Sequence, residues 1–143
     1  MPLFARLLIG IAAALLAGWI AHGPVGRGEA FVDRLEAQAL AVVREAEIPG
    51  VEARLQRNPL ARRALLSGPA DDFQREGTGY FPGLNDRILG LSGLGAIGWA
   101  DGRGDRGWAL PLLLETEALV LVFFGLGLLL GWRLFRPRRE GYL

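Results

Sequence analysis

Few residues in this 143-residue chain have the types and spacing that catalysis requires. His22 is the single histidine. It could ligate a metal or a tetrapyrrole, but a lone histidine at the end of an apolar segment is more typical of a membrane-interface anchor. Ser67 lies outside any GxSxG motif, and no cysteine is present to act as a nucleophile or metal ligand. Adjacent Asp71 and Asp72 could pair as acid and base, but at a helix start they are typical of caps.

The remaining motifs of known chemistry are also incomplete. Gly93-Leu94-Gly95 lacks the following lysine and helix of a phosphate-binding loop. Histidine and the carboxylates nowhere show the spacing of metal ligands. We therefore predict that the protein is not an enzyme, with no catalytic residues, no cofactor and no metal.

Two acidic residues stand in an otherwise apolar segment near the end of the chain, Glu115 and Glu117. On a helix they point about 200° apart, so one can face protein while the other faces lipid headgroups. They could be ion or proton ligands, since carboxylates within membranes tend to be functional. The simpler interpretation is a pair of solvated acids near a favourable helix N-terminus.

A second charged group is basic and could contact anionic headgroups or an acidic partner. The alternative interpretation of this basic group is a solvated face whose charges nearby acids neutralise. The four residues cluster around one predicted strand and its turn: Arg54, Arg57, Arg62 and Arg63.

The elements that must position these residues include two apolar blocks. Hydrophobic residues make up 51% of the chain, and the excess lies in residues 3–21 and 109–135. The first block, as a helix, spans roughly 28 Å, close to the thickness of a bilayer core. A cleaved signal peptide is its rival, with Arg6 in the charged region and cleavage after Ala21-His22-Gly23. We favour a retained membrane helix.

The second apolar block begins near Pro111, which suits a first helical turn, and is also long enough to span. Four arginines follow or end it, whereas the N-terminal tail carries only Arg6. The loop between the blocks is too long for its charges to influence orientation. We therefore expect a bacterial inner-membrane protein with two spans, both termini cytoplasmic and the central region periplasmic.

Small residues on both predicted helices favour helix–helix contact, either with each other or with other subunits. These residues are Gly10, Ala14 and Gly18 in the first helix, and Gly125, Gly127 and Gly131 in the second. The residues expected at the membrane interface are Trp19, His22, Trp108, Glu115, Glu117 and Trp132.

The region between the spans alternates helical and strand patterns. Residues 28–46 are amphipathic with a helical period, and 51–56 alternate as in a half-buried strand. Further strands are predicted at 64–66 and 96–99, a helix at 71–76 and one or two helical turns at 84–91. The Gly/Pro-rich residues 77–83 interrupt the pattern, and 102–107 are predicted to be a flexible linker.

This order of helix, strand, strand, helix and strand resembles the BON domain of bacterial envelope proteins. The residues that carry the resemblance are Ile48–Val51, Leu66-Ser67-Gly68, Asp71–Glu76 and Leu91–Leu94. It covers residues 28–101, but the glycine usual before the second strand is replaced by Arg62-Arg63. The resemblance implies a non-enzymatic domain that contacts phospholipid, cell wall or partner proteins.

Together these patterns predict an α+β fold, with a small three-stranded sheet and two helices between two transmembrane helices. The predicted divisions are a first span at 1–22, a periplasmic BON-like domain with linkers at 23–108, a second span at 109–135 and a basic cytoplasmic tail at 136–143. The net charge of +1 gives no case for nucleic acid.

The leading functional hypothesis is a structural accessory subunit of a larger membrane complex, such as a photosynthetic or respiratory assembly. Its partners would be other membrane subunits and membrane lipid. The alternatives are an envelope module that binds lipid or peptidoglycan, and, third, a small ion- or proton-conducting oligomer.

Overall fold

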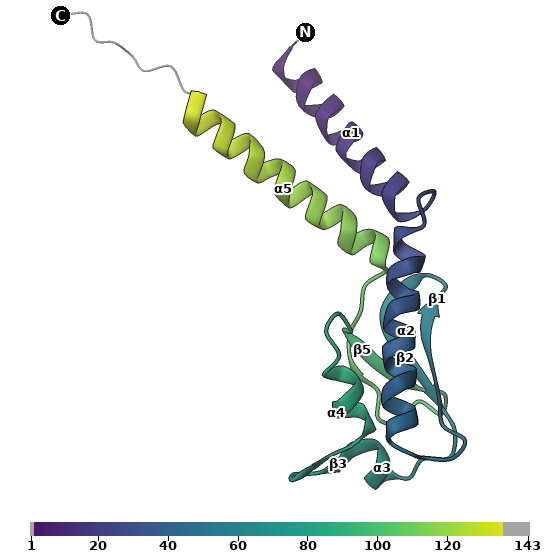
Figure 1. Ribbon diagram of the computed structural model, residues 1–143. Coiled ribbons are helices and arrows are strands. Elements are labelled where there is room, and N and C mark those ends of the chain that lie inside the picture. The colour runs from purple at the N-terminus through teal and green to yellow at the C-terminus, as the bar shows by residue number, and fades with distance from the viewer. Residues whose placement is uncertain (1, 136–143) are drawn as a thin grey trace, which may run out of the picture.

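The computed structural model describes residues 2–135 and shows a mixed α+β domain with two long apolar helices at one end (Figure 1). The predicted basic tail at 136–143 lies outside the described residues. The elements in chain order are α1 (Leu3–His22), α2 (Arg27–Glu45), β1 (Glu52–Arg57), β2 (Leu60–Ser67), α3 (Asp72–Glu76), β3 (Gly77–Thr78), β4 (Phe81–Pro82), α4 (Leu84–Leu89), β5 (Ala96–Trp99), β6 (Arg106–Gly107) and α5 (Leu112–Phe135).

The main sheet has four strands in the order β1-β2-β5-β6. β1 and β2 form an antiparallel hairpin, β5 runs parallel to β2, and the short β6 is antiparallel to β5. The three-stranded sheet that the sequence predicts is therefore one strand too small. The prediction of a flexible linker at residues 102–107 is wrong, because Arg106 and Gly107 form β6 and pair with Ile97 and Ala96 of β5.

One face of the sheet holds the core. Alternate residues of β1 and β2 are buried there beneath α2, as period-2 alternation requires, whereas all four residues of β5 are buried and this strand lies against α4. On α2 the buried stripe is Val32, Leu35, Ala39 and Val43, spaced at three and four residues. Ile88 of α4 is fully buried in the same core, whose apolar side chains each contribute about 1.5–3 kcal/mol.

A buried polar cluster fastens the segment after β5 to the domain. The Asn85 side chain is fully buried. Its oxygen accepts the indole N–H of Trp99 at 2.9 Å, and its amide nitrogen donates to Glu76 at 2.9 Å and to the carbonyl of Gly104 at 3.2 Å. Asp105 accepts the backbone N–H of Trp99. These bonds explain why this glycine-rich segment follows the sheet rather than hanging free.

The helix predicted at 71–76 forms, and its cap is as expected. The Asp71 carboxylate accepts the backbone N–H of Gln74, and the Gln74 side chain accepts the N–H of Asp71. The Gly/Pro-rich interruption that follows is a small hairpin, in which Thr78 pairs with Phe81. This hairpin lies at the end of the domain farthest from α1 and α5 (Figure 1).

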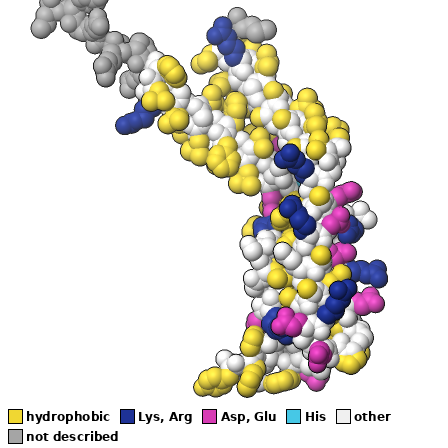
Figure 2. Space-filling model, in the orientation of Figure 1, with side chains coloured by type: hydrophobic (Ala, Val, Ile, Leu, Met, Phe, Trp, Pro, Cys, Tyr) yellow, Lys and Arg dark blue, Asp and Glu magenta, His cyan; other side chains and the backbone are white. Residues whose placement is uncertain are grey.

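Helices α1 and α5 are each long and apolar enough to span a membrane. They meet close to the domain and separate toward the two ends of the chain (Figure 1). Hydrophobic side chains cover their outer surface, whereas charged side chains of both signs cover the domain (Figure 2). This abrupt change in surface is expected where a chain leaves water for lipid.

We predict that Asn85→Leu lowers the free energy of unfolding by roughly 2–4 kcal/mol, because it leaves the buried indole N–H of Trp99 without an acceptor. Gln38→Leu, the same change at an exposed position of α2, is the control. Thermal unfolding of the full chain in mild detergent, followed by circular dichroism, measures both. Equal unfolding midpoints for the two variants would contradict the role given to Asn85.

Candidate functional site

The three elements α1, α2 and α5 meet at one end of the domain (Figure 1). α1 ends at His22 and α2 begins at Arg27, so only four residues join them. α5 begins at Leu112, directly after Pro111 forms a bridge with Ala61 at the start of β2. We call this meeting point the junction.

An ion pair across the junction joins the sheet to α5. The guanidinium of Arg62 donates to both carboxylate oxygens of Glu115, at 2.6 and 3.1 Å, and to the carbonyl of Gly93 at 3.2 Å. Hydrogen bonding to Glu115 raises the pKa of Arg62 above its ordinary value. Bidentate pairing fixes direction as well as distance, so it orients the first turn of α5 on β2.

The second acidic residue of α5 lies against α1. A side chain added at Gly18 would come within 2.8 Å of the Glu117 carboxylate, so the glycine leaves the room that this group occupies. One carboxylate oxygen of Glu117 is buried and makes no hydrogen bond within residues 2–135. Both acids therefore contact protein and are half-buried rather than fully solvated, and their place at a membrane interface stays a prediction.

The small residues predicted for helix contact divide into two groups. Gly10 and Gly18 face α5, and a Cβ at Gly10 would lie 2.9 Å from the Phe124 ring. Ala14, between them on the same stripe, is half-buried. The glycines of α5 have open space where a side chain would stand, and they are Gly125, Gly127 and Gly131. The seam between α1 and α5 therefore uses the glycines of α1 only.

The residues predicted at the membrane interface lie in different surroundings. Trp19, Trp108 and Trp132 are all exposed. Trp19 lies in the last turn of α1 near the domain, Trp108 in the segment before α5, and Trp132 in the last turn of α5, away from the domain. His22 is half-buried, and its ring packs over Gly28 of α2, where a Cβ would come within 2.6 Å of the ring. His22 thus supports the turn between α1 and α2.

The four arginines predicted to contact an anionic surface do not form one free basic patch. Arg57 pairs with Asp33 and Glu36 of α2, Arg62 with Glu115, and Arg63 with Asp105. Arg54 pairs more loosely with Glu52, at 3.4 Å. Arg62 and Arg63 are neighbours on one strand and therefore point to opposite faces of the sheet. Each charge has a local acidic partner.

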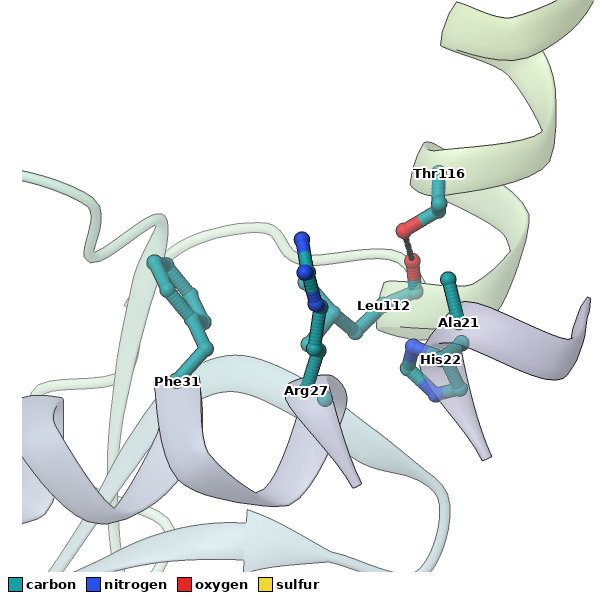
Figure 3. A pocket seen from close by; sticks show the side chains of 7 residues that line it. Ala21, His22, Arg27, Phe31, Leu112 and Thr116 are labelled. Carbon is teal, nitrogen blue, oxygen red and sulfur yellow. Dashed lines mark hydrogen bonds between the residues drawn. The ribbon is translucent and has the colours of Figure 1, made fainter. Parts of the chain in front are cut away.

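A cavity of about 250 Å³ lies at the junction, lined by residues of α1, α2 and α5. Figure 3 shows Arg27 and Phe31 rising from α2, and His22 from the end of α1, toward Leu112 and Thr116 of α5. The lining is mainly apolar, and the Thr116 hydroxyl donates to the Leu112 carbonyl at 2.8 Å. The side chain of Arg27 makes no hydrogen bond or ion pair within residues 2–135.

The opposite end of the domain carries exposed aromatic side chains. Tyr80 is 95% exposed, Phe81 68% and Phe73 60%. Phe73 and Phe81 line one shallow hollow with Ile48 and Leu84. We call Phe73, Tyr80 and Phe81 the aromatic tip, which forms part of the hydrophobic lower end in Figure 2.

Sequence reasoning missed both the cavity and the aromatic tip. Two aromatic residues within a Gly/Pro-rich stretch were a usable signal for the tip, because such a stretch offers no core to bury them. No sequence signal identifies Arg27, since only the fold shows which arginines find an acidic partner. Among residues 2–135, no three acidic or histidine side chains gather to hold a metal ion.

Comparison of the chain with models of known protein families, with curated proteins and with solved structures finds no match. The functional argument therefore rests on the geometry of the junction, the seam and the aromatic tip.

We predict that reversing either charge of the Arg62–Glu115 pair loosens α5 from the domain. The double variant Arg62→Glu with Glu115→Arg should restore the attachment of α5. A coupling of about 1–2 kcal/mol is expected for this half-buried pair. Because the chain has no cysteine, spin labels can be placed at Gln38 and Leu119 alone. The single variants should broaden the distance distribution between the labels.

Arg54→Glu is the matched control, since its pair with Glu52 lies on the exposed sheet and touches no helix. An unchanged distance distribution in both single variants would show that the pair does not orient α5.

We also predict that Gly18→Leu destabilises the pairing of α1 with α5 by about 1–3 kcal/mol, because the seam has no room for the side chain beside Glu117. Gly127→Leu should leave the pairing unchanged, since its side chain would enter open space. Thermal unfolding of both variants in the same detergent compares them. Adding Glu117→Ala to Gly18→Leu should recover part of the loss, and its failure to do so would argue against the contact.

Proposed function

We propose that this protein is a non-enzymatic accessory subunit of a larger complex in a bacterial inner membrane. In this proposal α1 and α5 cross the membrane with both termini in the cytoplasm, and the central domain stands in the periplasm. The domain presents its surface to other subunits. The setting we propose is a photosynthetic or respiratory assembly.

The aromatic tip carries the proposal. Three large aromatic side chains stand exposed at the end of an otherwise charged domain, far from the two apolar helices. Such a group is unfavourable in water and is typical of contact surfaces, where aromatic residues supply much of the binding energy. A partner that covers Phe73 and Phe81 would also fill the hollow beside them.

The outer surface of α5 supports the same proposal. Gly127 and Gly131, four residues apart, share one face of α5 that α1 does not use, and another helix backbone could lie closely on this face. The aromatic tip and this glycine face lie at opposite ends of the molecule, so one partner subunit or two neighbours could engage them.

The alternatives find less support in the geometry. An envelope module that binds lipid or wall through Arg54, Arg57, Arg62 and Arg63 would have to break existing ion pairs. A proton path would need Glu115 and Glu117, but Glu115 is held by Arg62. The BON-like identity of the domain stays a proposal, supported by the order α2, β1, β2, α3 and β5.

The test is to extract the tagged full chain from its native membrane in mild detergent, then to identify copurifying proteins by native gel and mass spectrometry. We expect a large band with stoichiometric partners. Gly127→Leu with Gly131→Leu, and separately Tyr80→Ser with Phe81→Ser, should each reduce the partner yield several-fold without unfolding the chain.

Two controls match these variants. Val122→Leu adds bulk at another exposed position of α5, and Leu65→Ser removes an exposed apolar side chain from the sheet. Both should retain the partners. A single small species from native membranes, with no partner protein, would refute the accessory-subunit proposal.

A further inference from the structure

We propose that the cavity at the junction binds one anionic phospholipid. Its phosphate would lie between the side chains of Arg27 and His22, and the upper part of one acyl chain would occupy the apolar lining beside Leu112. The site differs from the arginine cluster considered above, and none of its residues belongs to the aromatic tip.

The position of the cavity is the first argument. α1 ends at His22 and α5 begins at Leu112, and both residues line it. When the two helices span the bilayer core, the cavity lies at the depth of the lipid headgroups on the side that holds the domain. A phospholipid of that leaflet is therefore the abundant amphipathic molecule that the cavity would meet.

The charge of the cavity is the second argument. Arg27 is exposed and unpaired within the described part of the chain, whereas Arg57, Arg62 and Arg63 around β1 and β2 each engage an acid. An unpaired guanidinium suits a phosphodiester, because its planar donors match two phosphate oxygens. Glu115, the acid in the first turn of α5, is already engaged by Arg62. His22, at the end of α1, lines the same cavity as Arg27 (Figure 3).

The size and lining of the cavity are the third argument. At about 250 Å³ it is smaller than a site that encloses a whole small molecule. It suits part of a larger molecule whose remainder lies along the membrane surface of the helices. Ala21, Phe31 and Leu112 make its wall apolar, and Gly28 provides the space in which the His22 ring stands.

This inference does not depend on which partner proteins the chain has. It rests only on the insertion of α1 and α5 into a membrane. Two of its three lining elements are these helices, which lie outside the region that resembles the BON domain. The experiment therefore uses a purified full chain without partners and examines insertion separately.

The test measures lipid binding to the full chain in detergent by native mass spectrometry. Dioleoyl phosphatidylglycerol and dioleoyl phosphatidylcholine are compared, because they share acyl chains and differ in net charge. We expect one bound phosphatidylglycerol and weaker phosphatidylcholine binding. Arg27→Gln should weaken phosphatidylglycerol binding roughly fivefold and remove the preference between the two lipids.

Arg34→Gln is the matched control. Arg34 stands on the same face of α2, seven residues farther from the junction, and it has no acidic partner among the residues described. It should leave binding unchanged. Ala21→Phe, which fills the cavity, should weaken both lipids, and circular dichroism should show that the variant is folded.

Three results would overturn the proposal. The first is equal binding of the two lipids by the unaltered chain. The second is an equal loss of phosphatidylglycerol binding in Arg27→Gln and Arg34→Gln, and the third is release of the chain from native membranes by alkaline carbonate. The last result would also remove the membrane placement in the proposed function. Loss of partner proteins with lipid selectivity intact would refute the accessory-subunit proposal alone.

Discussion

The bidentate contact between Arg62 and Glu115 decides how the water-exposed and apolar parts of this protein are joined. It connects β2, in the middle of the sheet, to the first turn of α5, and the Ala61–Pro111 bridge continues the connection along the backbone. α1 then packs on α5 and runs into α2 through a four-residue turn. The seam, the cavity and the direction of both apolar helices all depend on this attachment.

Local patterns predicted most of the elements. The amphipathic stretch at 28–46 is α2 at Arg27–Glu45, and the predicted strand at 96–99 is β5. Interactions between distant residues account for the errors. β2 begins at Leu60 rather than Ala64, because pairing with β1 and β5 extends it through two arginines that disfavour a strand by pattern. β6 exists because Asn85 and Asp105 hold a glycine-rich segment against Trp99.

The candidate sites could be predicted from the sequence only where all their residues lie on one face of a single helix. A small-residue stripe can be read from spacing, and Gly10 and Gly18 do face another helix. Spacing does not tell which acid will neutralise an arginine. Arg57 is joined to Asp33, twenty-four residues away, and Arg62 to Glu115, fifty-three residues away. The significance of Arg27 follows from its place in the cavity together with the absence of such a partner, and both are properties of the folded chain.

The divergence of α1 and α5 has a mechanical consequence. Both helices are attached at the domain and separate toward the chain ends, so their relative orientation is fixed at one end only (Figure 1). Phe124 against Gly10 acts as a spacer partway along. A small tilt at the clamped base becomes a larger displacement at the free ends, roughly in proportion to the 1.5 Å that each helical residue adds. The base of the domain therefore sets the spread of the two helices along their whole length.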